Sequence, residues 1–186
     1  MFEGKLVEAF AAAADRVRWR ISEEDASARL GARWRQPRLA YRDVASATNR
    51  TTLIAAVLPA RSASTHTLFC LKTPLPLHAQ HLLCALLNSL VVNYLVRRRV
   101  TTHVTTAIVE RLPVPSVADL GPWAGVLADA GEHLAHGASD DVTVRMNARV
   151  AAVYQLSSAE FRHLLDTFPL VDARLRDRML ECFEAL

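Results

Sequence analysis

The pattern of apolar and polar positions predicts a helix near the start of the chain and strands after it. Within residues 5–20, apolar side chains recur at about helical spacing, which predicts an amphipathic helix. Residues 38–44 and 51–58 have the composition of strands, and the second is an almost continuous apolar run, typical of a strand buried on both faces. Pro59 ends that run, and residues 67–72 predict a third short strand.

The longest apolar pattern predicts a single helix over residues 78–97. It follows the sequence Thr73-Pro-Leu-Pro, which breaks the preceding strand. Residues 107–109 predict another short strand. A weaker signal, Ser22 three residues before Asp25, predicts a short helical turn in the first part of the chain.

From about residue 117 the pattern is helical. Ser157 and Glu160 form a capping-box sequence, which predicts that a helix begins there. Phe168-Pro169 separates the last two helices. The predicted helices cover residues 117–136, 143–155, 158–166 and 171–185.

These elements predict a mixed α/β (α+β) fold, in which a small mixed sheet is packed by a long helix, with an N-terminal helix and a C-terminal helical tail. With 186 residues, 51% of them hydrophobic, the chain can bury a core. We expect a helical lead-in over residues 1–37, an α/β core over residues 38–115 and a helical tail over residues 116–186.

The net charge of +3 is unevenly distributed. Residues 1–50 hold ten basic and seven acidic residues, residues 51–111 hold six and one, and residues 112–186 hold six and eleven. The positive excess over the first two thirds favours a polyanionic partner. Twenty of the 22 basic residues are Arg, which suits phosphate and guanine better than Lys does, although genomic base composition alone also produces an excess of Arg.

No sequence feature indicates secretion or a membrane partner. The cysteines Cys70, Cys84 and Cys182 are far apart and form no CxxC pair, so neither a zinc site nor a disulfide framework is indicated. The first residues lack the apolar stretch of a signal peptide. The most apolar stretch, residues 82–96, is too short to span a bilayer. We therefore expect a cytoplasmic protein.

The sequence also lacks the common catalytic motifs. Its six glycines form neither GxGxxG nor GxxxxGK, its seven histidines form no HExxH, and no GxSxG is present. His133 and His136 share a face of a predicted helix, but no acidic or cysteine ligand lies at metal-binding spacing. We expect no catalytic residue and no metal site in this chain; an independent enzyme would need a dispersed site.

Two stretches together resemble a known family. Residues 38–59 contain Arg-Asp-Val-Ala-Ser-Ala-Thr-Asn-Arg-Thr, and residues 86–97 are Leu-Leu-Asn-Ser-Leu-Val-Val-Asn-Tyr-Leu-Val-Arg, with Thr101-Thr-His and Leu112-Pro-Val-Pro after them. In this order they resemble the specificity region that follows the catalytic domain of TaqI-like and type IIG N6-adenine DNA methyltransferases. Phe2-Glu-Gly-Lys, Tyr154-Gln-Leu-Ser-Ser and Thr167-Phe-Pro are similar to the flanking segments of that family, so the resemblance covers nearly the whole chain.

The resemblance implies a function within a restriction–modification or phage-defence system. The family's catalytic Asn/Asp-Pro-Pro-Tyr tetrad and its S-adenosylmethionine-binding motif are absent from this sequence. The chain would therefore choose and hold a target in double-stranded DNA, without a cofactor of its own. S-adenosylmethionine would bind in an N-terminal methyltransferase domain of the same parent chain, which would methylate a flipped adenine. Whether that parent also cleaves DNA is left open.

The resemblance and the charge distribution together indicate candidate contacts to DNA phosphates and base edges. They lie on a polar turn, on a polar loop, and at and after the end of the long helix. The candidates are Arg42 and Arg50 on the turn, Arg61, Thr65 and His66 on the loop, and Arg97, Arg98, Arg99, Thr101, Thr102 and His103 at the helix end. Adjacent arginines point in different directions on a helix, so the three in a row cannot all face one partner.

Each group also has a structural interpretation. Arg42 and Asp43 would hold the turn together, the polar loop would only be solvated, and the three arginines would balance the dipole at the end of the helix. Asn88 and Asn93 lie in an apolar helix, and we expect them to fix packing through buried hydrogen bonds rather than to contact bases.

A second function class is also compatible with the sequence. The chain would then be a protein-interaction or scaffold module that packs on the methyltransferase or on a partner subunit and does not itself contact DNA. The acidic, helical last third of the chain supports this alternative.

Overall fold

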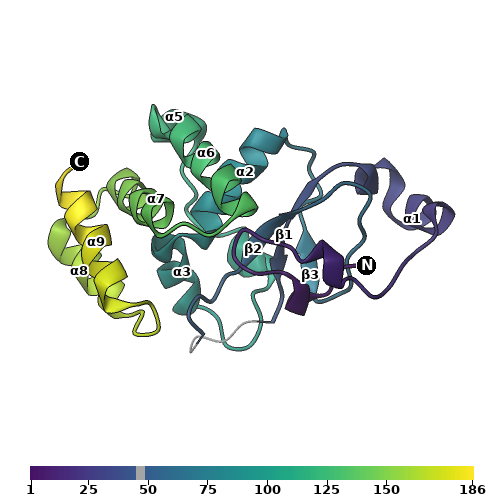
Figure 1. Ribbon diagram of the computed structural model, residues 1–186, viewed down its shortest axis with the longest axis horizontal. Helices are drawn as coiled ribbons and strands as arrows, with labels where there is room; N and C mark the ends of the chain where they lie inside the picture. Colours follow the sequence, from purple (N-terminus) through teal and green to yellow (C-terminus); the bar gives the residue numbers. More distant parts are fainter. Residues whose placement is uncertain (45–48) are drawn as a thin grey trace.

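The computed structural model describes residues 1–44 and 49–186, which form a mixed α/β fold as predicted. In chain order the elements are η1 (Gly4–Leu6), η2 (Ala14–Arg16), α1 (Glu23–Leu30), η3 (Gly31–Arg35), β1 (Arg38–Arg42), β2 (Ala55–Leu58), β3 (Leu68–Cys70), α2 (Leu77–Asn88), α3 (Leu90–Arg97), α4 (Thr106–Val109), α5 (Val117–Leu120), α6 (Trp123–His136), α7 (Asp140–Val153), α8 (Ser158–Asp166) and α9 (Ala173–Glu184), where η marks a 3₁₀ helix. Figure 1 shows the sheet near the middle of the molecule, with α1 towards one extremity and α8 and α9 at the other.

The sheet is antiparallel rather than mixed as expected, and its three strands lie in the order β2-β1-β3. In the central strand, Ala40 lies opposite Ala56 of β2 and Cys70 of β3. Leu39 and Tyr41 belong to the larger hydrophobic cluster, which includes α2, whereas Ala40 belongs to a smaller cluster with residues of the lead-in. The alternation of side chains along β1 therefore gives the sheet two buried faces. Three of the four predicted strands are confirmed, each shorter than expected.

The predicted helix over residues 5–20 is wrong. This segment pairs with the rest of the chain instead: Phe10 forms a parallel bridge with Ala56, and the Phe10 N–H donates to the carbonyl oxygen of Ala55 at 2.9 Å. Just before it, Phe2 forms a parallel bridge with Ser64. Leu6 and Val7 cover the sheet as part of the smaller hydrophobic cluster, whereas Phe10 belongs to the larger one. Tertiary pairing has overridden the local helical preference, which is a weak determinant of structure.

Both predicted capping sequences are confirmed. At the start of α1, Ser22 Oγ accepts a hydrogen bond from the Asp25 N–H at 3.0 Å. At the start of α8, Ser157 Oγ accepts from the Glu160 N–H at 3.3 Å, while the Glu160 carboxylate accepts from the Ser157 N–H at 2.8 Å. The bonds from the backbone and hydroxyl of Ser157 lower the pKa of Glu160 below its usual 4.5, because they stabilise the carboxylate.

The predicted helix over residues 78–97 is divided at Ser89. α2 and α3 meet there at an angle of 58°. Ser89 has extended backbone angles, φ −64° and ψ 152°, and its hydroxyl accepts from the Val92 N–H at 3.2 Å. Since Ser is a good N-cap, the second helix begins with its own cap in the middle of an apolar run.

Two further corrections concern the second half of the chain. Residues 107–109 lie in the helical turn α4 rather than in a strand, because three apolar residues are too few to distinguish the two periodicities. The expected helix over residues 117–136 is interrupted at Gly121 and Pro122, where Gly121 adopts a φ of 52°. The remaining predicted helices are confirmed as α7, α8 and α9, with shifts of up to three residues at their ends.

One hydrophobic cluster connects the sheet with α2, α3 and the helices of the tail. α2 and α6 approach closely at Gly131, where an added Cβ would collide with the carbonyl oxygen of His81. Within the described residues, no single helix is long and apolar enough to cross a membrane. α2 and α3 meet that test of length and composition only as a bent pair, and most of their residues are buried.

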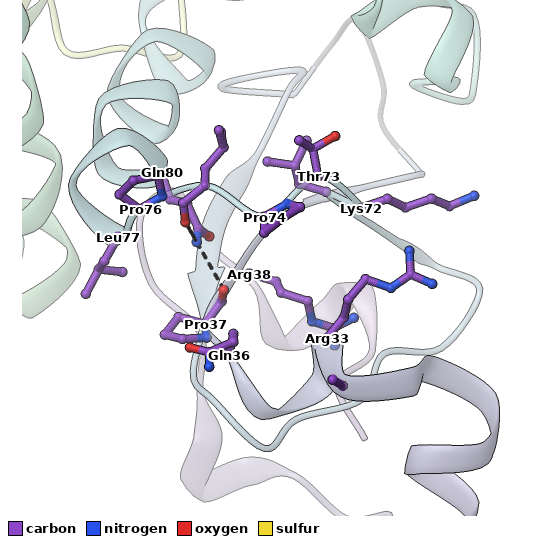
Figure 2. A pocket seen from close by; sticks show the side chains of 13 residues that line it. Arg33, Gln36, Pro37, Arg38, Lys72, Thr73, Pro74, Pro76, Leu77 and Gln80 are labelled. Atoms are coloured by element: carbon purple, nitrogen blue, oxygen red, sulfur yellow. Dashed lines mark hydrogen bonds between the residues drawn. The ribbon is translucent and has the colours of Figure 1, made fainter.

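A groove of about 640 Å³ lies at the end of the sheet where β1 begins. One wall is formed by residues 32, 33 and 36–38, which run from η3 to the start of β1, and the other by residues 71–77, which run from the end of β3 to the start of α2. Gln80 of α2 lies in the lining between the two walls (Figure 2). The groove is therefore formed by segments that are far apart in the sequence.

Candidate nucleic-acid interface

Buried asparagines hold the backbone that follows the predicted polar turn. Asn93 Oδ1 accepts hydrogen bonds from the N–H groups of Thr52 and Leu53, both at 2.8 Å. Asn88 Oδ1 accepts from the Ala55 N–H at 3.0 Å, and its amide nitrogen donates to the Ala55 carbonyl at 2.8 Å. Both side chains are buried, so their predicted packing role is confirmed. Residues 52–55 are thereby held against α2 and α3.

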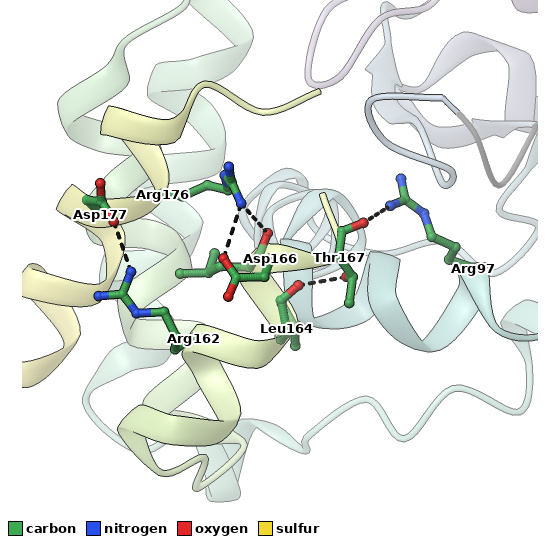
Figure 3. Close-up of polar contacts among 8 residues, drawn as sticks. Arg97, Arg162, Leu164, Asp166, Thr167, Arg176 and Asp177 are labelled. Carbon is green, nitrogen blue, oxygen red and sulfur yellow. Dashed lines mark hydrogen bonds and ion pairs between the residues drawn. The ribbon is translucent and has the colours of Figure 1, made fainter. Parts of the chain in front are cut away.

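Arg97 turns its guanidinium inward, towards two other segments of the chain. Nη1 donates to the Thr167 carbonyl at 2.7 Å (Figure 3), Nη2 to the Asn49 carbonyl at 2.7 Å and Nε to Thr52 Oγ1 at 3.3 Å. The guanidinium carbon lies 4.1 Å from the ring centre of Phe168, a cation–π geometry. Burial lowers the pKa of Arg97. Contrary to expectation, Arg97 is a structural residue rather than a surface donor.

The loop after α3 presents polar side chains to solvent. Arg98, Arg99, Thr101 and Thr102 are all exposed. The guanidinium of Arg98 lies over the ring of Tyr94, 5.7 Å from its centre, and Nη1 is 3.4 Å from the Tyr94 hydroxyl. The other three side chains have no hydrogen-bond or ion-pair partner among the described residues. They are available for contacts to a ligand.

This loop is attached to the end of β1. The Val104 N–H donates to the Asp43 carbonyl at 2.7 Å, and Val44 pairs with His103 in an isolated antiparallel bridge. His103 Nδ1 lies 3.1 Å from Asp43 Oδ2, while its side chain remains 52% exposed. Val100 and Val104 are buried on either side. The exposed residues of the loop therefore sit on a fixed base, a common arrangement for binding loops.

The two arginines of the predicted turn differ in their surroundings. Arg42 Nη2 pairs with Glu8 Oε1 at 3.0 Å, and the Arg42 side chain is only 21% exposed, which favours its structural interpretation. Arg50 is exposed and forms no ion pair within the described part of the chain. Its carbonyl oxygen lies 3.4 Å from Arg97 Nη2, which puts it beside the end of α3. The turn residues Ser46 and Thr48 lie outside the described residues.

The loop predicted to carry Arg61, Thr65 and His66 packs mainly on the lead-in. Arg61 forms an ion pair with Glu23, and its guanidinium carbon is 5.4 Å from the ring centre of Trp34. The Thr65 N–H donates to the carbonyl of Phe2 at 2.9 Å, whereas His66 is exposed. Arg61 follows the end of β2 that pairs with the start of β1, so it lies away from the loop after α3. Arg61 and Thr65 therefore hold the lead-in in place.

The structure thus brings together part of the predicted set. The exposed residues on the two adjacent loops, which we call the basic edge, are Arg50, Arg98, Arg99, Thr101 and Thr102. His103 borders this edge through Asp43. Arg42 and Arg97 are partly buried and contact other parts of the chain, so they support the basic edge without belonging to it. Arg61 lies away from it, beyond the other end of β2.

The charges of the tail are arranged differently from those of the basic edge. In the tail, Arg162 pairs with Asp177 at 2.9 Å and Arg176 with Asp166 at 3.3 Å (Figure 3). None of the three arginines of the basic edge has an acidic partner among residues 1–44 and 49–186. Their charge is left uncompensated, which raises the local positive potential.

Groups that could support catalysis or metal binding are sparse in the described part of the chain. No three His, Cys, Asp or Glu side chains are placed there to hold a metal ion. Cys84 is buried beside Asn88, and burial raises the pKa of its thiol to about 12. A thiol of this kind is protonated at neutral pH and is a poor nucleophile.

One cationic site is not indicated by the sequence. Arg33, Arg38 and Lys72 line the groove of Figure 2, but they come from segments more than 30 residues apart and form no local motif. The pairing of β1 with β3 and the hydrogen bonds of Gln80 bring these segments together.

Comparison with known proteins adds no assignment. No family model, no curated protein and no solved structure matches this chain. The function is therefore proposed from the residues and their geometry.

Proposed function

We propose that this chain is the DNA target-recognition region of a restriction–modification N6-adenine methyltransferase of the type IIG-like class. The observation that carries the proposal is the basic edge, whose residues fall within or directly after the two stretches that resemble that family. Arg50 belongs to the first stretch, and Arg98, Arg99, Thr101 and Thr102 follow the second.

The chemistry of the basic edge suits duplex DNA. Arg side chains donate planar, charge-assisted hydrogen bonds to phosphates and to guanine edges. Thr hydroxyls donate to phosphate oxygens or meet base edges in a groove. Arg98 and Arg99 would supply much of the phosphate contact, and Thr101 and Thr102, further along the loop, would lie closest to the bases.

The catalytic step would take place in another domain. An N-terminal methyltransferase domain of the same parent chain would bind S-adenosylmethionine and receive the flipped adenine. The present chain would hold the duplex in register and select the site. Such a system would act in the cytoplasm, where host and invading DNA meet.

Binding to a random-sequence 20-base-pair duplex tests the proposal, since phosphate contacts do not depend on the target site. Fluorescence anisotropy of the full chain would be measured over a series of salt concentrations. Arg98→Gln with Arg99→Gln should weaken binding and reduce the slope of log K against log salt by about 1.8, or about 0.9 for each lost phosphate contact.

A matched control removes the same charge elsewhere. Arg145 and Arg174 are exposed residues of the tail without an ion pair among the described residues. Arg145→Gln with Arg174→Gln should leave the salt slope unchanged. An equal loss in both double variants would indicate a general charge effect, and no duplex binding at low salt would reject the proposal.

An apolar pocket supports a second candidate function, that of a scaffold module that packs on the methyltransferase domain. It has a volume of about 480 Å³, lies between α3 and α8, and is lined by Val91, Tyr94, Leu95, Tyr154 and Leu156 among others. In this case the chain would bind a separately produced catalytic domain of its parent in the absence of DNA. Tyr94→Asp would abolish that binding, while the arginines of the basic edge would be dispensable.

A further inference from the structure

The groove at the start of β1 is a second site with uncompensated positive charge. Its volume of about 640 Å³ is in the range of small-molecule sites. Among the described residues that line it are Arg33, Arg38 and Lys72, and none is Asp or Glu. Because β1 runs from Arg38 to Arg42, the groove lies at the opposite end of this strand from the attachment point of the basic edge.

The walls of the groove are held in position by one buried side chain. Gln80 Oε1 accepts from the Leu39 N–H at 2.6 Å, and Nε2 donates to the carbonyls of Pro37 at 3.1 Å and Leu75 at 2.9 Å. Gln80 is 5% exposed. It links the two walls to each other, so the groove is formed before any ligand arrives. Preorganisation of this kind lowers the cost of binding.

The cations of the groove have unused hydrogen-bonding capacity. Arg38 Nη2 donates to the Ser62 carbonyl at 2.7 Å, but its buried Nε has no partner within the described residues. Arg33 makes one long contact, from Nε to the Leu30 carbonyl at 3.5 Å, and Lys72 makes none among the same residues. Most of their N–H groups thus remain to be satisfied by solvent or by an anion.

The groove has a charged side and an apolar side. Figure 2 shows Arg33 and Lys72 on one side and Pro76 and Leu77 on the other, with Arg38 between them. Leu77 is 46% exposed, so its apolar side chain is accessible to a ligand. A ligand that fits both sides carries a multiply charged anion on a flat or apolar body.

We propose that this groove binds a nucleoside phosphate. The phosphate would contact Arg33, Arg38 and Lys72, because Arg donates in the bidentate geometry that phosphate accepts and three cations match a dianionic phosphomonoester. The base would lie against Pro76 and Leu77. A free nucleotide and the 5′-phosphorylated end of a DNA strand share this chemistry, and both are sources of the ligand.

Calorimetric titration of the full chain with AMP tests the assignment. Arg33→Gln with Lys72→Gln should weaken AMP binding at least about tenfold, since two charge-assisted hydrogen bonds are lost. Both residues are exposed, so the fold should be retained, and thermal unfolding of the variant checks this. Adenosine, which lacks the phosphate, should bind at least about tenfold more weakly than AMP to the unaltered chain.

A second binding experiment shows whether the ligand is a free nucleotide or the 5′ end of a DNA strand. An eight-nucleotide single strand with a 5′-phosphate is compared with the same strand ending in a hydroxyl. Tighter binding of the phosphorylated strand than of AMP, lost in Arg33→Gln with Lys72→Gln, assigns the groove to DNA ends. AMP binding without binding of the phosphorylated strand assigns it to free nucleotides.

Nucleotide binding to the groove can be tested independently of duplex binding to the basic edge. Arg98→Gln with Arg99→Gln should leave AMP binding unchanged even where it weakens duplex binding. The groove proposal is overturned if AMP and the phosphorylated strand do not bind at millimolar concentration. It is also overturned if both bind the groove variant as tightly as the unaltered chain.

Discussion

The guanidinium of Arg97 lies over the ring of Phe168, 4.1 Å from its centre, although the two residues are separated by 71 positions in the sequence. The same guanidinium donates to the carbonyls of Thr167 and Asn49. One side chain thus connects the end of α3 with the turn between α8 and α9 and with the backbone beside Arg50. The position of the basic edge therefore depends on the tail.

Replacement of Arg97 should be costly to stability. Arg97→Ala removes the donor to the carbonyls of Thr167 and Asn49, and should lower the free energy of unfolding by about 3 kcal/mol. Arg97→Lys should have an intermediate effect, because an ammonium group cannot reach both carbonyls in the geometry of the guanidinium. Urea unfolding followed by circular dichroism measures both. Arg99→Ala is the control and should change stability by less than about 0.5 kcal/mol; equal effects at both positions would contradict the structural role of Arg97.

Removal of the Asn93 amide should loosen the backbone before β2. Asn93→Ala takes away the acceptor of the Thr52 and Leu53 N–H groups in a buried site, at a cost of roughly 1–3 kcal/mol for each group. Amide hydrogen exchange should become faster at residues 52 and 53. Asn147→Ala, which removes the acceptor of the Leu90 N–H instead, should speed exchange at Leu90 and leave those two amides protected. Unchanged protection in Asn93→Ala would refute this role.

Two glycines of α6 should respond in opposite directions to alanine. Gly131→Ala introduces a Cβ against the His81 carbonyl and should destabilise the protein by about 1–3 kcal/mol through overpacking. Gly125→Ala meets open space and should stabilise the helix by about 0.5–1 kcal/mol. Thermal unfolding of the two variants gives the comparison. If both changes shift stability the same way, the close approach of α2 and α6 is not as described.

Buried His81 should make the protein sensitive to mild acid. Burial lowers its pKa below the ordinary value of 6.5, and its Nδ1 has no partner within the described residues. Above pH 6.5 the ring is neutral in both states. Below that pH the unfolded chain takes up the proton first, so the free energy of unfolding falls as pH falls towards the lower folded pKa, by at most about 1.4 kcal/mol per pH unit.

Calorimetric melting at pH 7.0 and 5.5 measures this effect. His81→Gln should reduce the difference in melting temperature between the two pH values. His66→Gln, at an exposed position on the loop after β2, should leave the difference as it is in the unaltered chain. A difference that is the same in all three proteins would exclude His81 as its source.

Helical periodicity and buried polarity were the most informative sequence signals. The helices of the tail were predictable because their apolar residues recur with one period, and the Ser157–Glu160 cap marks the start of α8. The role of Asn88 and Asn93 was also predictable, because an amide inside an apolar helix must be satisfied by nearby backbone. These inferences depend only on local sequence.

The errors at the lead-in and at Arg97 arose because distant residues decide the outcome there. The lead-in has a helical pattern, but its bridges to Ser64 and Ala56 are formed by chain some 50 residues away. The local sequence gives no reason to treat Arg97 differently from Arg98 and Arg99. Its structural role follows from contacts with Thr167 and Phe168, which are 70 and 71 residues away. Likewise, no local pattern could place Arg33 beside Lys72.

The break at Ser89 changes the directions in which Asn88 and Asn93 point. On a straight helix, Asn88 and Asn93 would be separated by about 140° around the axis, since each residue advances by about 100°. They could not both reach one segment of extended chain. The 58° bend changes the phase of the second helix, so both amides meet the backbone of residues 52–55. A single serine that interrupts the apolar run thereby aligns two helices with one strand, and a substitution that restored a straight helix would misalign them.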